Sequence, residues 1–385
     1  MKITINRSDL LHAIQTVYRT SLAKITMPIL GGMLIKAEEG FITATLTDID
    51  LTTQCSVPAN VVENDLICLP ARQISDIIRH LTDDLISIET LPEKDCARIL
   101  YGESEINIYG FPPEQFPEIP HPSGENSLKA PKKIFKEMIR QAIFAVSTDR
   151  TRPLFTGVLF EISDQKLRLV ATDTHRLALT ETSLDRGQLT EEDRKLSTGN
   201  CQLATNVIVP GSALNELNRI LQADEENMAI EIGQNHIFFS TEDTILSSRL
   251  IAGQFPLYNQ IIPTKYISRL QAGVRETYDA VRRAALLPQE EVPVIHFSLS
   301  KQQCILFLNT SAGWIREKIS ADYQGEPLEV FFNARYLMDC LHVVPTDDFS
   351  IDFTGSLSAA VIRPLERDNF LSLLLPARPR EEKNL

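Results

Sequence analysis

The chain has 385 residues, a length that suggests two or three domains. Hydrophobic residues make up 43% and charged residues 23%, which is ordinary for a globular protein and excludes disorder as the main state. No stretch approaches roughly 18 consecutive apolar residues, and the N-terminus lacks the apolar core of a signal peptide, so we expect a cytoplasmic protein. The net charge of −13 makes the average surface repel nucleic acid, so any role on DNA requires a local basic face.

The cysteines are too widely spaced for a zinc or redox motif. None of the six lies in a CxxC pair, so we expect reduced, mostly buried thiols. They are Cys55, Cys68, Cys96, Cys201, Cys304 and Cys340.

An amphipathic helix is predicted three times along the chain. Residues 8–18, 131–146 and 274–287 each place apolar side chains at helical spacing on one face. Ser8 suits the N-cap of the first helix, and Pro131 suits the first turn of the second.

A second helix and a proline-rich ending complete this repeat. A helix is predicted after Pro70, Pro210 and Asn333, in each case about 60–80 residues beyond the start of the first. Residues 116–120 and 255–263 contain prolines that cannot pair in a central strand, which indicates linkers.

Short runs of alternating polar and apolar residues predict strands with one buried face. These strands come in clusters rather than alternating singly with helices, which favours an antiparallel α+β domain, used three times, over a parallel fold. The runs lie at residues 41–46, 99–109, 167–171, 236–240, 305–308 and 349–353.

Enzyme motifs are mostly absent, and the strongest enzymatic lead is acidic. Residues 47–50 and 172–175 both follow a predicted strand, and their carboxylates and histidine could hold a divalent metal that activates water for hydrolysis. The simpler interpretation is that Thr and Asp side chains cap a turn, and the recurrence in two repeats favours it. The metal hypothesis would use Asp48, Asp50, Asp173 and His175.

Lysine and arginine gather on the predicted helices. Five lie in or near the helix at 131–146 and three in the helix at 274–287, and Arg72 and Arg79 belong to the helix after Pro70. Cations on equivalent helices could form one basic surface that faces phosphates. The alternative is a set of solvated helix faces.

The repeats and several local motifs, in order from residue 1 to about 378, resemble the bacterial β sliding clamp, the processivity subunit of the replicative DNA polymerase. This collinearity is more specific than any single motif. The matching segments are residues 1–11, 28–31, 47–51, 70–72, 152–158, 171–178, 332–337 and 373–378.

The resemblance implies three clamp domains, at residues 1–122, 123–263 and 264–385, each with antiparallel sheets and two helices. Two chains would form a head-to-tail dimeric ring whose helices face duplex DNA without reading its sequence. Such a clamp needs no catalytic residue, cofactor or metal. Its partners would be the replicative polymerase, the clamp loader and repair proteins. A third possibility is a divergent clamp-like protein that binds peptides but does not load on DNA.

The resemblance also implies DNA contacts and a ring interface. The alternative for the DNA contacts is that these residues are surface cations without a partner. The alternative for the interface is that its side chains fill the cores of their own domains. The DNA-facing residues would be Lys24, Arg72, Arg150 and Arg152. The interface would pair an edge strand near Ile106 and Ile108 with a helix end at Leu286 and Leu287.

A peptide-binding pocket between the second and third domains is implied in the same way, as an apolar groove with a few polar groups. Its residues would be Phe155, Thr172, Thr174, His175, Arg176, Leu177, Pro256, Gln260, Ile261, Val292, Asn333, Tyr336, Leu357, Ala359, Leu373, Leu374, Leu375, Pro376, Ala377 and Arg378.

The chain departs from the family pattern at three places near this pocket. The family usually has glycine where this chain has Thr174, and arginine is common where Gln260 stands. The family commonly ends just past the position of Arg378, whereas residues 379–385 follow here. These changes bear on peptide preference more than on the ring.

Overall fold

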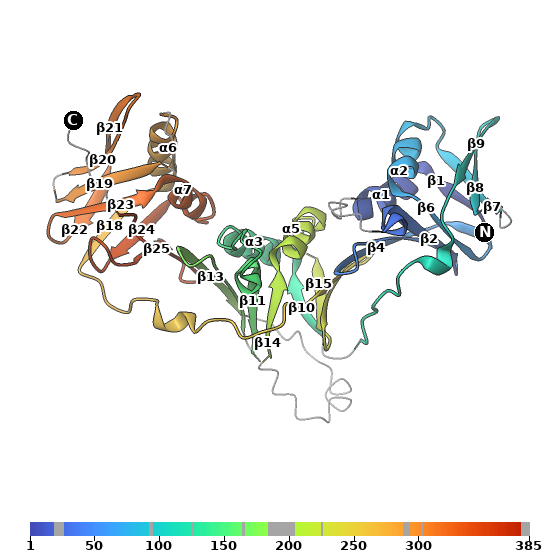
Figure 1. Cartoon of the computed structure of the whole chain (residues 1–385), viewed down its shortest axis with the longest axis horizontal. Coiled ribbons are helices and arrows are strands. Elements are labelled where there is room, and N and C mark those ends of the chain that lie inside the picture. Colours follow the sequence, from blue (N-terminus) through green and yellow to red (C-terminus); the bar gives the residue numbers. More distant parts are fainter. Residues whose placement is uncertain are drawn as a thin grey trace. The chain divides into compact units, whose positions relative to one another are not determined.

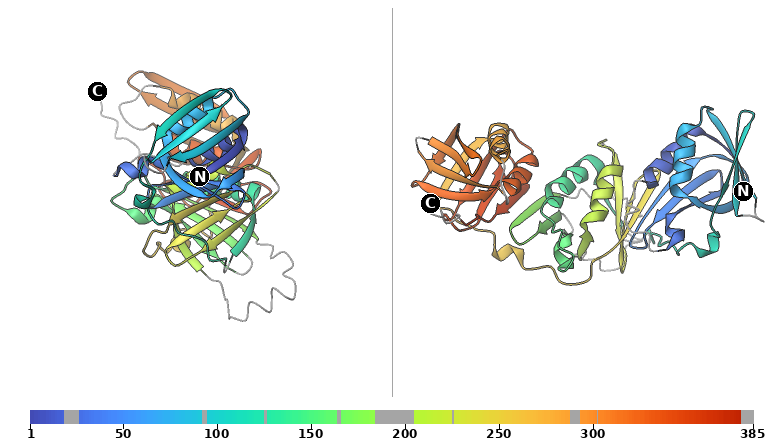
Figure 2. Two further views of the ribbon diagram at one scale, coloured as in Figure 1. Left: turned by 90° about the vertical axis from the view of Figure 1, so that its right-hand side faces the viewer. Right: turned by 45° about the horizontal axis from the view of Figure 1, so that its top comes forward.

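The computed structural model describes residues 1–18, 27–91, 95–124, 127–163, 166–183, 205–224, 226–287, 293–301 and 303–378. The chain divides into two compact units. The first combines Met1–Lys136 with Ser212–Leu250, and the second combines Glu137–Gly211 with Ile251–Leu385. Figures 1 and 2 show the helices and strands, coloured along the sequence. Each unit contains two antiparallel sheets and α-helices, so the predicted α+β class is confirmed.

The first unit is built on a five-stranded and an eight-stranded sheet (Figure 1). The five-stranded sheet has the order β5 (Asn60–Glu63), β1 (Lys2–Asn6), β7 (Leu85–Leu91), β8 (Cys96–Tyr101), β9 (Ser104–Tyr109). The eight-stranded sheet has the order β10 (Ser127–Pro131), β15 (Asn227–Ile232), β16 (His236–Ser240), β17 (Thr244–Arg249), β4 (Leu51–Pro58), β3 (Phe41–Thr47), β2 (Gly32–Glu38), β6 (Asp65–Pro70).

Helices α1 (Arg7–Tyr18) and α2 (Ala71–His80) pack against each other and against these sheets. Leu10, Ile14 and Val17 of α1 are fully buried, which is the apolar stripe that the sequence predicted. They belong to one core cluster that draws side chains from both sheets and both helices.

The second unit is built on a nine-stranded and a four-stranded sheet. The nine-stranded sheet has the order β14 (Thr205–Pro210), β11 (Gly157–Ile162), β12 (Lys166–Thr172), β13 (Arg176–Ser183), β26 (Phe370–Leu374), β25 (Ala360–Pro364), β24 (Asp348–Phe353), β18 (Ser268–Gly273), β22 (Ala321–Gln324). The four-stranded sheet has the order β21 (Gly313–Ile319), β20 (Gln303–Thr310), β19 (Val294–Ser300), β23 (Leu328–Asn333).

Helices α6 (Val274–Ala285) and α7 (Ala334–His342) pack together on the core of this unit. Two further helices, α3 (Lys132–Ile143) and α5 (Gly211–Ile220), have residues in both units. Each of the six predicted helices is present and begins within one residue of its predicted start, so the threefold repeat of helix pairs is confirmed. Within the described ranges, no helix is both long and apolar enough to cross a membrane.

The sheets differ from the sequence prediction in two ways. Residues 99–109 were expected as one strand, which is wrong, because the chain reverses at Gly102 between β8 and β9. Gly102 has a φ of +51°, which glycine adopts readily. The pairings of β4 with β17 and of β13 with β26 also join strands from different predicted domains into common sheets. The predicted domain boundaries themselves remain a prediction.

The cysteines follow the expectation where the structure describes them. Cys55, Cys68, Cys96, Cys304 and Cys340 are free and buried, and Cys201 lies outside the described residues. Burial raises the pKa of Cys68, Cys304 and Cys340 to about 12, so these thiols stay protonated and unreactive.

Candidate functional site

The turn after β12 is closed by the side chains of Thr172 and Asp173. The Thr172 hydroxyl donates to the carbonyl oxygen of Arg176 (2.7 Å) and accepts from the N–H of Thr174 (3.2 Å). One carboxylate oxygen of Asp173 accepts from the N–H groups of His175 and Arg176, both at 2.9 Å. These bonds stabilise a turn, as the simpler interpretation of the motif predicted.

The turn after β3 repeats this arrangement in the first unit. The N–H of Ile49 donates to the Thr47 hydroxyl (3.0 Å), and the N–H of Leu51 donates to the Asp48 carboxylate (2.7 Å). Partial desolvation raises the pKa of Asp48, against the opposing effect of the Leu51 N–H. Thr310 closes the turn after β20 in a similar way. The turns are therefore matching parts of a structural repeat.

The metal-hydrolase hypothesis gains no support from this geometry. Asp48 and Asp50 belong to the first unit, whereas Asp173 and His175 belong to the second. The carboxylates of Asp48 and Asp173 already accept bonds within their own turns. Among the described His, Cys, Asp and Glu residues, a different set has its ligand atoms within 4.8 Å of one another: His12, Cys55 and Asp243.

Arg176 ties the second turn to helix α7. Its guanidinium donates to Asp173 (3.0 Å) and to Asp339 (2.6 Å), and it lies over the ring of Tyr336, 4.4 Å from the centroid. Burial opposes the charge of Arg176, but the carboxylates of Asp339 and Asp173 outweigh it and raise the pKa of this side chain. Arg176 is buried, so it holds the turn against α7 without forming part of an exposed surface.

Helix α7 presents Tyr336 beside the same turn. The Asn333 side chain caps the helix by accepting from the N–H groups of Arg335 (3.0 Å) and Tyr336 (3.3 Å). The ring of His175 stacks on that of Tyr336 with 6.2 Å between centroids. His175 and Tyr336, far apart in the sequence, therefore form one aromatic surface.

The end of β26 lies against this surface. The N–H of Leu375 donates to the carbonyl oxygen of His175 (2.9 Å), and the N–H of Ala377 donates to that of Phe331 (2.7 Å). Leu375 is 40% exposed. Leu374 points to the other face of the sheet and fills the core against α6 and α7.

A buried apolar cluster lies on the sheet face opposite that core. Leu177 of β13 is paired with Leu373 of β26, and both pack with Phe255 and Tyr258 of the linker. Because Leu177 and Leu373 are buried in this cluster, they form the floor of the predicted pocket and not its open surface.

The predicted pocket residues that the structure describes all belong to the second unit, but they differ in exposure. The exposed ones include two large apolar side chains, Ile261 (52%) and Leu357 (69%). The exposed set is Thr174, His175, Pro256, Gln260, Ile261, Leu357, Leu375 and Arg378. The half-buried set is Phe155, Asn333, Tyr336, Ala359, Pro376 and Ala377, and the buried set is Thr172, Arg176, Leu177, Leu373 and Leu374. Val292 lies outside the described residues.

Thr174 adopts a backbone angle that favours glycine. Its φ is +79°, and the matching residue of the first turn, Ile49, has a φ of +84°. A left-handed angle costs a residue with a Cβ roughly 1–2 kcal/mol. The chain therefore keeps the geometry for which the family pattern uses glycine, with a β-branched residue in that place.

The anchor of the linker was not predicted from the sequence. The buried Tyr258 hydroxyl donates to Glu161 (2.5 Å) and accepts from Arg168 (3.2 Å), which also donates to Glu181 (2.8 Å). Burial and the bond to Glu161 raise the pKa of Tyr258. Glu161, Arg168 and Glu181 are cross-strand neighbours on β11, β12 and β13, and their alternating charges are the signal that could have revealed this row.

The proposed DNA contacts have few internal partners. Arg72 is exposed on the first turn of α2, and its nearest carboxylate, Asp76, is 3.9 Å away. Arg150 is exposed and makes no ion pair within the described part of the chain, whereas Arg152 pairs with Asp149 at 2.9 Å. Lys24 lies outside the described residues.

The helices carry a different charge from the rest of the chain. The six α-helices that the structure describes contain twelve Lys or Arg and seven Asp or Glu. The whole chain contains 38 Lys or Arg and 51 Asp or Glu. Net positive charge is therefore concentrated on the helices, while the remainder of the chain is strongly acidic.

The predicted interface residues lie at the ends of the sheets and helices. Strand β9 is the outer strand of the five-stranded sheet, as expected, but Ile108 is buried in the core and Ile106 packs against it. Leu286 follows α6 and is 74% exposed, whereas Leu287 packs against its own core.

Known proteins match this chain along its whole length. Residues 1–120 match the N-terminal domain of the DNA polymerase III beta subunit, residues 129–257 its central domain and residues 259–378 its C-terminal domain. A beta sliding clamp of Staphylococcus aureus is 31% identical over 390 residues, covering 98% of this chain and 99% of the relative.

Solved structures agree with this match. A DNA polymerase sliding clamp from Bacillus subtilis superimposes with a TM-score of 0.92 at 29% identity, covering 99% of this chain and 100% of the other. A clamp from Pseudomonas aeruginosa bound to griselimycin has a TM-score of 0.89 at 27% identity, covering 98% and 100%.

Three repeated domains with paired, net-basic helices define a clamp-type DNA-binding protein. The chain belongs to the DNA polymerase III beta-subunit family, the bacterial beta sliding clamps. Its function is that of a DNA sliding clamp in replication, as the resemblance implied.

Proposed function

We propose that two copies of this chain close head to tail into a ring around duplex DNA, and that the ring has no catalytic activity of its own. Each chain contributes three domains, at residues 1–122, 123–263 and 264–385. The ring holds DNA topologically in the bacterial cytoplasm and tethers the replicative polymerase, the clamp loader and repair proteins. Membership of the sliding clamp family supports this proposal.

The observation that carries the proposal is the excess of basic residues on the helices of an acidic chain. Exposed cations such as Arg72 on α2 attract phosphates without reading bases, and Arg150, in the turn beyond α3, adds to them. An acidic remainder disfavours wrapping of DNA on other surfaces. Weak attraction on one set of helices suits a protein that must stay on DNA and still slide.

The outer strands of the sheets support closure by a second copy. Strands β9 and β21 each end a sheet, and such edges pair readily with another chain. Leu286 is the exposed apolar residue that closure would cover. Ile106, Ile108 and Leu287 pack in or against the cores of their own units, so they would support the interface without being its main exposed contacts.

Light scattering after size exclusion, across a dilution series, tests the ring. We expect a mass near twice 43.3 kDa that persists on dilution, and retention on circular DNA that is lost when the DNA is linearised. Leu286→Asp should give monomers, whereas Val62→Asp, at another exposed apolar residue, should not. A wild-type monomer at all concentrations, or equal retention on both DNA forms, contradicts the proposal.

The peptide pocket is the second part of the proposal. Exposed Ile261, Leu357 and Leu375 offer apolar contacts, and the stacked rings of His175 and Tyr336 offer an aromatic surface. The buried bonds of Arg176 hold these groups in place. The griselimycin-bound relative from Pseudomonas aeruginosa supports a ligand site on this fold.

Fluorescence anisotropy with labelled peptides from the host's replicative polymerase tests the pocket. The double variant Ile261→Ser/Leu357→Ser should weaken binding by about tenfold or more, because exposed apolar anchors carry much of such binding. Val62→Ser is the matched control in the first unit. Unchanged binding by the double variant means that the pocket is assigned wrongly. Peptide binding without retention on circular DNA would favour the clamp-like protein that does not load.

A further inference from the structure

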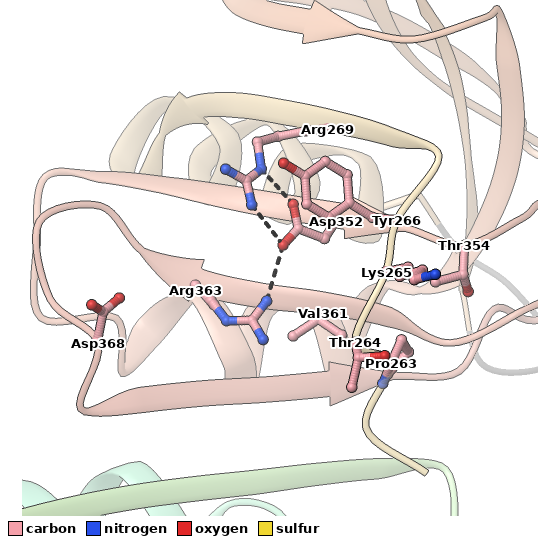
Figure 3. Close-up of a pocket in the computed structure, with 10 residues that line it drawn as sticks. All are labelled: Pro263, Thr264, Lys265, Tyr266, Arg269, Asp352, Thr354, Val361, Arg363 and Asp368. Atoms are coloured by element: carbon pink, nitrogen blue, oxygen red, sulfur yellow. Dashed lines mark hydrogen bonds and ion pairs between the residues drawn. The ribbon is translucent and has the colours of Figure 1, made fainter. Parts of the chain in front are cut away.

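A polar pocket of about 290 Å³ lies on the nine-stranded sheet where the linker enters β18 (Figure 3). The linker supplies one wall, and strands β18, β24 and β25 supply the floor. The lining residues are Pro263, Thr264, Lys265, Tyr266, Arg269, Asp352, Thr354, Val361, Arg363 and Asp368.

Two arginines in the floor share one buried carboxylate. Arg269 donates to both oxygens of Asp352 (2.5 and 2.9 Å), and Arg363 donates to one of them (2.9 Å). The guanidinium of Arg269 also lies over the ring of Tyr266, 4.4 Å from the centroid. Both guanidiniums are therefore fixed in position before any ligand arrives.

The pocket keeps unused positive charge. A guanidinium has five N–H donors, and Asp352 takes only one from Arg363. Lys265 is exposed and pairs with no carboxylate in the described parts of the chain. Asp368 is the other acid in the lining and lies across the pocket from Lys265 (Figure 3). Three cations thus face two carboxylates, and one of those carboxylates is already neutralised.

The pocket lies on the same face of the nine-stranded sheet as the proposed peptide site. Arg269 is paired with Asp352, Asp352 with Val361, Val361 with Leu373, and Leu373 with Leu177. Paired residues of antiparallel strands point to the same face of a sheet, and neighbouring strands are about 4.8 Å apart. Arg269 and Asp352 in the pocket therefore lie in one row across the sheet with Leu373 and Leu177 of the peptide site. The linker that carries Ile261 in the one site carries Lys265 in the other.

The alternation of side chains along each strand also shows that the pocket does not open on the face of the sheet that packs against the helices. Leu270, Ile351 and Ile362 are sequence neighbours of the floor residues and pack in the core with α6 and α7. The pocket therefore opens away from the helices that would meet phosphates. This argues against DNA phosphates as the ligand and favours an acid on a bound protein partner.

We propose that this pocket binds an aspartate or glutamate side chain of a partner peptide whose apolar anchors occupy the neighbouring site. The inference rests on the proposed peptide site and adds a charged position to it. The volume is large enough for one or two side chains. Fixed arginines bind carboxylates well because little ordering remains to be done on binding.

Anisotropy with a matched peptide set tests the proposal. The shortest labelled polymerase peptide that binds the wild-type chain is extended at either end by Glu-Glu or by Gln-Gln. At one of the two ends, the Glu-Glu form should bind about tenfold more tightly than the Gln-Gln form at low salt, and the ratio should fall as salt is added.

Variants locate the effect. Arg363→Gln should bring the Glu-to-Gln ratio near one, and Lys265→Gln should lower it, while the unextended peptide binds both as it binds the wild type. Asp352 keeps both bonds to Arg269 in these variants, so the fold should persist. Arg316→Gln removes an exposed arginine from β21 and should leave the ratio unchanged.

The outcomes separate the two proposals. If the Glu-Glu and Gln-Gln peptides bind the wild-type chain equally well at both ends of the peptide, the proposed acid-binding pocket is wrong, while the peptide site stands. The same holds if Arg363→Gln leaves the affinity ratio unchanged. If no polymerase peptide binds, the peptide site fails and the acid-binding pocket fails with it.

Discussion

The turns after β3 and β12 are closed by matching Thr and Asp hydrogen bonds in two different units, and the second turn is also tied to helix α7 through Arg176. In the first, Leu51 ends the turn as a buried apolar residue. In the second, Arg176 stands in that place and joins Asp173 to Asp339. The shared Thr-Asp pair makes the turn, and the residue that ends it decides what the turn is attached to.

This difference gives one copy of a repeated turn surface groups that the other copy lacks. The exposed positions of the first turn hold Ile49 and Asp50, which have no aromatic partner among the described residues. In the second turn the matching positions hold Thr174 and His175, and His175 stacks on Tyr336. A site can therefore arise in one copy without disturbing the scaffold that both copies share.

Removal of Arg176, the residue that distinguishes the second turn from the first, should have the largest effect on stability. Arg176→Ala leaves Asp173 and Asp339 without their cation, and we expect a loss of about 3 kcal/mol in the free energy of unfolding. Urea unfolding measures it. The double variant with Asp339→Ala should lose less than the sum of the two single changes, and strict additivity would contradict the coupling.

Removal of the turn carboxylate should destabilise the second turn more than the first. Asp173→Ala should cost about 2–3 kcal/mol because it also removes one of the two carboxylates that pair with Arg176, whereas Asp48→Ala should cost about 1 kcal/mol for the bond to Leu51. Urea unfolding of both variants under one condition gives the comparison. Equal losses would show that the link to helix α7 adds no stability to the second turn.

Glycine should relieve the strain that both turns share. Thr174→Gly and Ile49→Gly should each stabilise the chain by about 0.5 kcal/mol, because relief of a left-handed angle exceeds the entropy lost by glycine. Thr43→Gly, within strand β3, is the control and should destabilise. If the turn variants lose stability like the control, the strain is absent.

The smallest effect is the pH dependence of the first turn. The pKa of Asp48 is raised above its value of 3.8 in the unfolded chain, so its contribution is present below 3.8 and lost as the pH rises through the folded pKa. The urea midpoint of the wild type should therefore fall slightly relative to Asp48→Asn as the pH rises from about 3.5 to 6. A rise in that difference would give the wrong sign.

Much of the scaffold was predictable because it depends on local patterns. Apolar spacing located all three first helices, and the turn chemistry of Thr172 and Asp173 was recognised because it depends on neighbours within four residues. The strand-like run at residues 99–109 failed, because alternation continues through a hairpin and only Gly102 marks the reversal.

The candidate site was only partly predictable. The resemblance named Leu373 and Leu374 together, yet one lies in the apolar floor and the other fills the core behind it. It named Arg176 without its partner Asp339, which is 163 residues away. Three arginines that matter in the second unit, Arg168, Arg269 and Arg363, were not singled out, because their partners lie on neighbouring strands.

The sequence by itself determined the repeated helices, the strand clusters, the capped turns and the family, because each depends on short-range spacing or on the order of motifs. The tertiary structure alone decided which strands join the shared sheets, which pocket residues are floor and which are surface, and how two arginines come to share Asp352. Those features depend on pairing between distant strands, whose choice is made by burial and hydrogen bonding across the whole unit.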